Sequence, residues 1–316
     1  MGDHQPGGLL GKPEQHVRMD ERILRLIGDS QFEGDLYEAA CLNLQDRRNK
    51  LRFNNFAYAM RELAGHTLAR LAPDAEVKKC VWWSAKAEGE THQVTRIERA
   101  VYATQGGLSN FYVRKRLGLD FAESHLELRD AIKRLSDYTH IKPDVFGMSD
   151  EETDRLAAET TEAVAGLMAA IQECRAAVAD RLSDAITDAA IQQILGESLD
   201  AVDELATHYF VEEVYVDSHE VTGITAEAVH FRASGTIGVT LPWGSNTDVR
   251  NGDGLEMDES FDFTCELVCE TPNPDPGTLE YVENSVLVDT RDWQQGPDDW
   301  ADHPDVPTTA ALRPDI

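Results

Sequence analysis

Two arginine–histidine pairs in the N-terminal half could perform acid–base chemistry on a phosphodiester. One is Arg61 with His66 in Arg61-Glu-Leu-Ala-Gly-His66, and the other is Arg134 with His140 in Arg134-Leu-Ser-Asp-Tyr-Thr-His140. A histidine titrates near neutrality and can take the proton from a ribose 2′-hydroxyl. An arginine can hold the phosphate and stabilise the charge that builds on its oxygens. This chemistry needs no metal and would cut RNA but not DNA.

The spacing alone does not place either pair in one site. Residues five apart on an ideal helix point about 140° apart, so Arg61 and His66 would have to meet in a cleft made with another helix or subunit. The alternative is that Arg61 is a solvated helix residue and His66 a half-buried polar one. His140 could instead cap the carbonyls at a helix end.

Charge is divided unevenly along the chain, and this division indicates where nucleic acid could bind. Residues 1–142 contain 22 Lys and Arg against 20 Asp and Glu, whereas residues 143–316 contain 7 against 38, within a net charge of −29. A polyanion needs cations to replace its counterions, so we expect nucleic-acid contacts in the first 142 residues. The candidate residues are Arg47, Arg48, Lys50, Arg52, Arg96, Arg99, Arg114, Lys115 and Arg116. The alternative is that these cations form solvated helix faces or pair with local acids.

Metal-dependent chemistry has weaker support in the sequence. A restriction-type core needs an Asp and a Glu-x-Lys motif on neighbouring strands, yet no lysine follows Lys142, and Glu76-Val-Lys78 is the only such triplet before it. The acidic segment 248–259 resembles a calcium loop, but Arg250 stands where an oxygen ligand is needed. We therefore expect no metal and no cofactor.

Hydrophobic periodicity predicts the fold class. Apolar residues recur at helical spacing over 18–27, 32–49, 53–71, 96–104, 110–117, 121–138, 150–182 and 184–195. From about residue 207 the period becomes two, with strands predicted at 209–216, 226–233, 235–241, 261–270 and 281–288, and residues 77–84 form a further candidate strand. The prediction is an α+β protein, with a mostly helical N-terminal two-thirds followed by a small antiparallel β domain.

These elements divide the chain into five expected regions. They are a flexible N-terminus (1–17), a helical nuclease domain (18–148), long connector helices (149–199), an antiparallel β domain (200–291) and a disordered acidic tail (292–316). No apolar run reaches the length of about 20 residues that spans a bilayer. The five cysteines are odd in number and widely spaced, which is typical of reduced thiols in a cytoplasmic protein.

A longer series of segments carries a family resemblance. It runs from Leu51-Arg-Phe-Asn-Asn-Phe-Ala-Tyr-Ala-Met-Arg61 through Cys80-Val-Trp-Trp83 and Tyr102-Ala-Thr-Gln-Gly-Gly-Leu-Ser109 to Trp243-Gly-Ser-Asn-Thr-Asp-Val-Arg250. This series resembles the bacterial predicted pPIWI-associating nucleases over roughly residues 30–290. The resemblance implies a link to Argonaute- or PIWI-like proteins in defence against foreign nucleic acid. The helical half, with its arginine–histidine spacings, also resembles the HEPN ribonucleases.

Three functions remain open from the sequence. The first is metal-independent RNA cleavage by Arg61 with His66, and by Arg134 with His140. The second is a non-catalytic adaptor that docks an Argonaute-like partner or a second copy of the chain, which the acidic C-terminal half favours. The third is a metal-dependent DNA nuclease.

Overall fold

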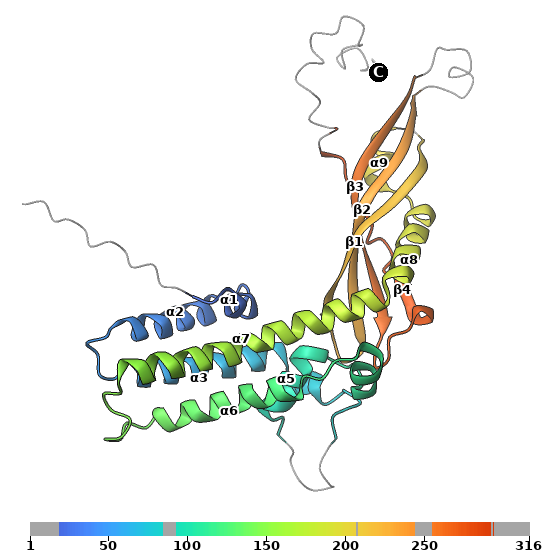
Figure 1. The fold of residues 1–316 in the computed structure, drawn as a ribbon. Helices are drawn as coiled ribbons and strands as arrows, with labels where there is room; N and C mark the ends of the chain where they lie inside the picture. Colours follow the sequence, from blue (N-terminus) through green and yellow to red (C-terminus); the bar gives the residue numbers. More distant parts are fainter. Residues whose placement is uncertain (1–18, 85–92, 207, 244–254, 292, 294–316) are drawn as a thin grey trace, which may run out of the picture. The chain divides into compact units, whose positions relative to one another are not determined.

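The computed structural model describes residues 19–84, 93–206, 208–243, 255–291 and 293. The chain divides into two units (Figure 1). The first, here called the helical unit, comprises Met1–Arg175 with Thr225–Glu227, and the second, the sheet unit, comprises Ala176–Ile224 with Ala228–Ile316. Helices fill the first part of the chain and an antiparallel sheet follows, so the predicted α+β class is confirmed.

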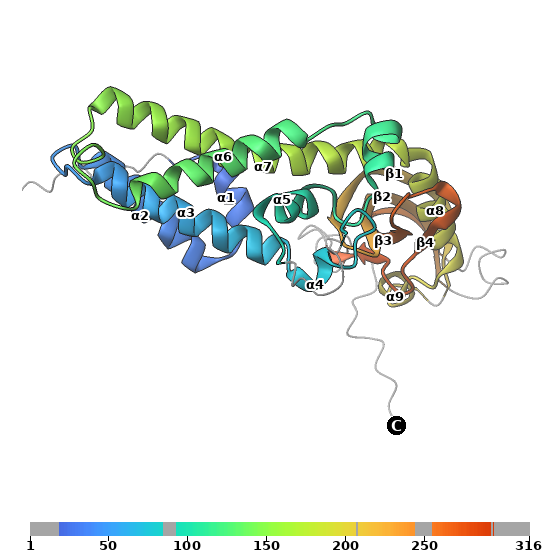
Figure 2. The same cartoon turned by 90° about the horizontal axis from the view of Figure 1, so that it is seen from below.

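The helical unit is made of helices that pack on one another. Its elements are α1 (Glu21–Ile27), α2 (Gln31–Gln45), α3 (Arg52–Leu71), α4 (Asp74–Val77), α5 (Arg96–Gln105), the π-helix η1 (Tyr112–Leu117), α6 (Ala122–Tyr138) and α7 (Asp150–Arg181), which continues into the sheet unit after Arg175. Helix α3 packs against α2, α5 and α6 (Figure 2). Phe56, Met60 and Leu63 on α3 are fully buried, so the predicted apolar stripe is the face that forms the core.

Local sequence signals fix where these helices begin. The side chains of Asp20, Ser30 and Thr95 accept hydrogen bonds from backbone N–H groups in the first turns of α1, α2 and α5. At α5 the bond is reciprocal, because Glu98 also accepts from the backbone of Thr95. Each cap satisfies N–H groups that have no partner within the helix.

The sheet unit contains α8 (Ser183–Gly196), α9 (Asp200–Asp203), β1 (Phe210–Ile224), β2 (Ala228–Trp243), β3 (Leu255–Glu270), β4 (Leu279–Tyr281) and β5 (Leu287–Asp289). The strands are antiparallel in the order β1-β2-β3-β4, and β5 also pairs with β3. Helix α8 packs on the sheet through Ile186, Ala190 and Ile194, which are all buried. Alternate residues of β2 are buried, which is the pattern of a sheet with one covered face.

Four expected strands were wrong in detail. The predicted strands 226–233 and 235–241 form the single strand β2, because Gly235 does not make a turn. It lies where the backbone of β1 comes so close that a Cβ atom would meet the carbonyl oxygen of Tyr215 at 1.9 Å. The predicted strand 281–288 is two short strands, β4 and β5, with Asn284 between them at a φ of 58°. Residues 77–84 form turns, in which Cys80 is buried beside Tyr102.

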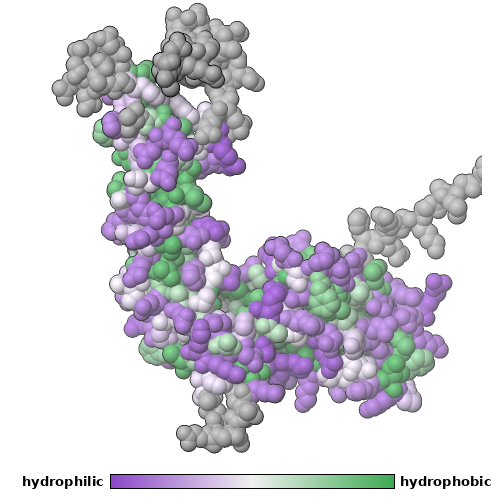
Figure 3. All heavy atoms as spheres, turned by 180° about the vertical axis from the view of Figure 1, so that it is seen from behind, coloured by the Kyte–Doolittle hydropathy of each residue, from purple (hydrophilic) through white to green (hydrophobic). Residues whose placement is uncertain are grey.

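Some predictions fall outside the described residues. These are the flexible N-terminus at 1–17, the tail at 294–316 and residues 248–254 of the acidic segment. Among the helices that are described, none is long and apolar enough to cross a membrane. On the faces drawn in Figure 3, hydrophilic and hydrophobic side chains are interspersed, which is the ordinary pattern of a protein surface.

Candidate nucleic-acid interface

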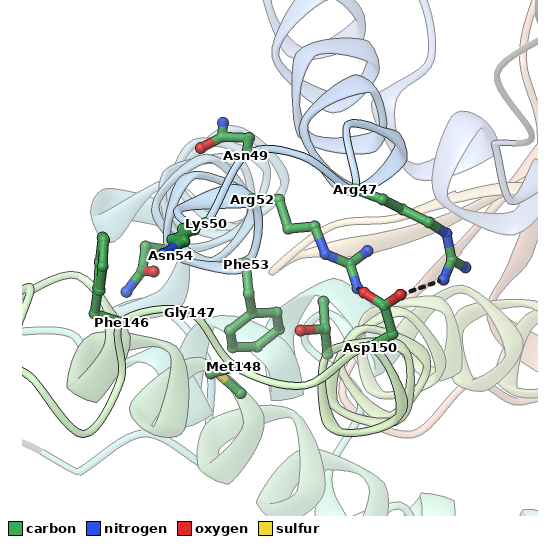
Figure 4. A pocket seen from close by; sticks show the side chains of 11 residues that line it. Arg47, Asn49, Lys50, Arg52, Phe53, Asn54, Phe146, Gly147, Met148 and Asp150 are labelled. Carbon is green, nitrogen blue, oxygen red and sulfur yellow. Dashed lines mark hydrogen bonds and ion pairs between the residues drawn. The ribbon is translucent and has the colours of Figure 1, made fainter.

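A pocket opens where α2 passes into α3, and three of the predicted nucleic-acid-binding residues line it. Its volume is about 200 Å³, and its wall includes Arg47, Lys50 and Arg52 from this connection. The segment that leads into α7 forms the other wall, with Phe146 and Asp150 among its residues (Figure 4). The basic run around residue 50 therefore converges on one concave site.

Two of these cations are already paired with acids. The Arg52 side chain is only 5% exposed, donates to the carbonyl oxygen of Leu44 at 2.9 Å and forms an ion pair with Asp150. Arg47 is exposed and donates to Asp150 at 2.8 Å and Asp154 at 3.3 Å. The hydrogen bond to Asp150 raises the pKa of Arg47. Both guanidinium groups are thus engaged by acids in the first turns of α7.

The other end of the pocket holds a cation beside an exposed aromatic ring. The Lys50 ammonium lies 5.8 Å from the centre of the Phe146 ring, and Phe146 is 47% exposed. Two buried atoms among the lining residues have no hydrogen-bond partner, namely Oδ1 of Asn54 and Oγ1 of Thr153. Arg48, the remaining member of this basic run, is exposed on the outside of the same connection. This end can accept a polar, negatively charged group.

The second basic run lies on the π-helix η1. Arg114, Lys115 and Arg116 are consecutive and exposed, and Arg114 forms a long ion pair of 3.4 Å with Asp120. The Arg116 guanidinium lies 5.9 Å from the centre of the Phe111 ring, which is 60% exposed. π-Helical turns are rare and occur frequently at functional sites. Like the pocket at Lys50, this surface combines a cation with an accessible aromatic face.

The predicted pair Arg96 and Arg99 does not act as one unit. Arg96 is exposed at the start of α5. Arg99 is turned inward, where it donates to the carbonyl oxygen of Ala72 at 2.7 Å and to Asp74 at 2.5 Å. Arg99 therefore holds the end of α3 and the start of α4 against α5.

The first arginine–histidine pair is spread around α3. Arg61 forms an ion pair with Glu62 at 2.7 Å, and its buried Nε atom has no hydrogen-bond partner. His66 is exposed, and its ring stands edge-on to that of Phe32 with 5.1 Å between the ring centres. No described cavity contains both side chains.

The second pair lies at the far end of α6. Arg134 forms an ion pair with Glu159 of α7 at 3.2 Å. His140 is exposed just beyond the end of α6, and Thr139 instead donates to the free carbonyl oxygen of Ser136 at 2.8 Å. The expected capping role thus belongs to Thr139, and among the described contacts His140 makes none.

The two pairs do not converge. Asn54, at the start of α3, donates to the carbonyl oxygen of Tyr138, at the end of α6, at 2.8 Å, so the two helices are antiparallel. His140 follows Tyr138 closely, whereas His66 lies further along α3 than Asn54 by roughly 18 Å at 1.5 Å per residue. A site that used both histidines would require a second copy of the chain or a rearrangement.

Acidic and thiol side chains give no metal centre in the described part of the chain. No group of three or more His, Cys, Asp or Glu residues there has a geometry that could hold a metal ion. The described cysteines are unpaired, and burial raises the pKa of Cys265 to about 11. Cys265 and Cys269 are both buried in β3, as expected of residues that pack in a core.

Comparison with known proteins supplies the family. One family model, described as a predicted pPIWI-associating nuclease, matches residues 25–164, and a second with the same description matches residues 171–294. The chain belongs to the predicted pPIWI-associating nucleases. No curated protein and no solved structure matches the chain.

In this predicted pPIWI-associating nuclease, the first family region contains every candidate site residue named from the sequence. The second region covers α8 and the sheet and carries most of the net negative charge. The resemblance noted in the sequence is confirmed at the level of the family. The two regions meet within α7, since one match ends at residue 164 and the other begins at residue 171.

Sequence reasoning missed a buried ionic cluster in the helical unit. Arg70 donates to Glu33 at 2.8 Å, and the Thr67 hydroxyl donates to the same carboxylate at 2.7 Å. Burial alone would raise the pKa of Glu33, but the hydrogen bonds from Arg70 and Thr67 outweigh it and the pKa is lowered. Glu33 lies in the first turn of α2, where an acid is common, so its spacing gave no signal of a buried role.

Proposed function

We propose that the chain binds single-stranded nucleic acid through cations and exposed aromatic rings of its helical unit, and that it acts with an Argonaute- or PIWI-like partner. The observation that carries this proposal is the pairing of Arg116 with the exposed ring of Phe111 on η1. Proteins that hold single strands combine cations along the backbone with aromatic faces on which bases stack. The arrangement of Lys50 and Phe146 supports the same reading.

Family membership supports the partner and the class of ligand. Both matched models are described as pPIWI-associating nucleases. The acidic C-terminal region repels phosphates, so we assign nucleic acid to the helical unit and the partner to the sheet unit. RNA is the expected strand if the histidines take part in cleavage, since their chemistry uses the 2′-hydroxyl.

Binding is tested by removing the η1 cations together. We expect the triple variant Arg114→Ala/Lys115→Ala/Arg116→Ala to bind a short single-stranded RNA more weakly, with a salt dependence reduced by about 0.7 in log–log slope per lost phosphate contact. The matched control is Lys78→Ala/Lys79→Ala/Arg129→Ala, which removes the same charge from other positions of the helical unit. An equal loss of RNA affinity in both triple variants would mean that binding depends only on net charge, and the proposed site on η1 would be wrong.

Cleavage is the second candidate function, and the family description favours it. The proposed groups are His66 with Arg61 and His140 with Arg134. If they act, the purified protein should cleave RNA in EDTA, and His66→Ala or His140→Ala should abolish cleavage without changing the unfolding temperature. Cleavage that EDTA stops would instead indicate a metal-dependent nuclease. Binding without turnover on any nucleic acid would favour the adaptor.

A further inference from the structure

A second pocket lies directly beside η1, and none of the roles described above uses it. Its volume is about 300 Å³, and aromatic and aliphatic side chains make up much of its wall. Trp82 and Phe121 contribute rings, while Val113, Leu119 and Leu126 contribute aliphatic groups. Arg114, one of the three exposed η1 cations, also lines it. The cavity is therefore largely apolar, and its charged wall residues are Arg114, its ion-pair partner Asp120 at 3.4 Å, and Glu98.

Two largely buried polar residues, His125 and Gln105, line this pocket. His125 is only 5% exposed, and its Nε2 lies 3.0 Å from the Thr104 hydroxyl, which donates its own proton to the carbonyl oxygen of Ala100. Only the tautomer with its hydrogen on Nε2 allows both contacts to be hydrogen bonds, and burial lowers the pKa of His125 to about 4, so the ring is neutral at pH 7. Its Nδ1 is left as an acceptor without a described partner.

Gln105 supplies the other acceptor. It is 5% exposed, and its amide nitrogen donates to the carbonyl oxygen of Leu108 at 2.8 Å and to Asn110 at 3.1 Å. Both amide hydrogens are thus used, and the amide oxygen has no described hydrogen-bond partner. This oxygen can accept a hydrogen bond, so a ligand that brings an N–H group into the pocket could pair with it.

We propose that this pocket binds one base of the single strand, with the adjoining phosphate on Arg114. This inference rests on the proposed binding function and specifies where a base would be held. A nucleobase has a flat apolar face that suits Trp82 and Phe121, and N–H donors on its edge that suit His125 and Gln105. Within a strand the base is joined through its sugar to a phosphate, which an unrelated apolar ligand does not have.

The test compares a short single-stranded RNA with the same strand in which several bases are replaced by abasic sites. Stacking contributes about 1–3 kcal/mol per base, so we expect the wild-type protein to bind the intact strand about tenfold more tightly. Leu126→Trp fills the pocket from a position that is 42% exposed, and it should bind the intact strand several-fold more weakly than the wild-type protein does, while its affinity for the abasic strand stays at the wild-type level. Ile97→Trp, which fills the pocket from α5, serves as the second obstruction if the first variant does not fold.

Leu195→Trp is the matched control, because Leu195 is 60% exposed on α8 and lies in the sheet unit. This variant should keep the wild-type preference for the intact strand over the abasic one. Equal binding of the two strands by the wild-type protein would overturn the base pocket and leave the cationic interface intact. Full preference in both obstructing variants would also overturn it. If neither strand binds, the proposed function itself is wrong and the pocket proposal fails with it.

Discussion

The Thr104 hydroxyl lies 3.0 Å from Nε2 of His125 inside the helical unit. When this hydroxyl donates to Ala100, the imidazole pairs with it in the tautomer that carries its hydrogen on Nε2. Burial lowers its pKa to about 4 from an ordinary value of 6.5. The relationship links the stability of the helical unit to pH, and it also fixes which ring nitrogen remains free to accept a hydrogen bond.

The first prediction concerns stability in mild acid. The folded-state pKa of His125 lies below the unfolded one, so the unfolded chain binds the extra proton and stability falls as pH decreases from about 6.5 toward about 4. The His125 contribution to the free energy of unfolding should fall by about 2 kcal/mol between pH 7 and pH 5. His125→Gln should show a smaller loss than the wild-type protein in urea unfolding at the two pH values. His140→Gln, a change at an exposed site, should lose as much unfolding free energy between the two pH values as the wild-type protein does. If His125→Gln loses as much too, the buried histidine is not the source of the pH dependence.

The second prediction concerns a close backbone approach within the helical unit. A Cβ atom on Gly107 would lie 2.2 Å from the carbonyl oxygen of Ala226, so Gly107→Ala requires the backbone to move. We expect it to destabilise the protein by at least about 2 kcal/mol. Gly65→Ala is the matched control, because nothing lies within 4 Å of its Cβ position in α3. That change should stabilise the helix by about 0.5–1 kcal/mol, and thermal unfolding of both variants measures the contrast.

The fold was largely predictable because its signals are local. The stripe containing Phe56, Met60 and Leu63 gave α3. The errors arose where tertiary contacts decide the outcome. A break was predicted at Ser234, but β2 runs through it, and Gly235 permits the close approach of β1 to β2. No local pattern reveals the neighbouring strand.

The candidate site was less predictable for the same reason. The basic runs at Lys50 and Lys115 were found from charge alone, since most of their cations are exposed, although Arg52 is buried. The pairing of Arg47 and Arg52 with Asp150 joins positions about a hundred residues apart, so spacing could not predict it. His125 falls at helical spacing with Phe121 and Leu128, which marks it as buried. That periodicity does not say which other segments complete the cavity.

The third prediction isolates stacking from charge. Phe111 is 60% exposed and makes its described ring contact with Arg116. Phe111→Leu should lower affinity for single-stranded RNA about tenfold while leaving the salt dependence unchanged, because a stacked base is lost but no phosphate contact is. Phe210→Leu on β1, where Phe210 is 57% exposed, controls for loss of an exposed ring. A fluorescence-anisotropy titration that gives equal affinities for the two variants would exclude Phe111 as a stacking platform.

The fourth prediction separates stability from binding at Asp150. Its carboxylate pairs with the buried Arg52 and with the exposed Arg47, so Asp150→Asn weakens two ion pairs at once. Asp154 and the carbonyl oxygen of Leu44 still contact Arg52. We therefore expect a loss of only about 1–2 kcal/mol in the free energy of unfolding, below the 3–5 kcal/mol of a fully orphaned buried charge.

The same change should strengthen nucleic-acid binding if the pocket near Lys50 contacts phosphate, because it removes a negative charge from the pocket wall and releases Arg47. Affinity for single-stranded RNA should rise several-fold, with a steeper salt dependence. Asp130→Asn is the matched control, since Asp130 pairs with the exposed Arg129 on α6, outside the residues that line this pocket. An affinity that rises equally in both variants would reflect net charge alone. A loss of stability in Asp150→Asn without any gain in binding would assign Arg47 and Arg52 to holding α2 and α3 against α7.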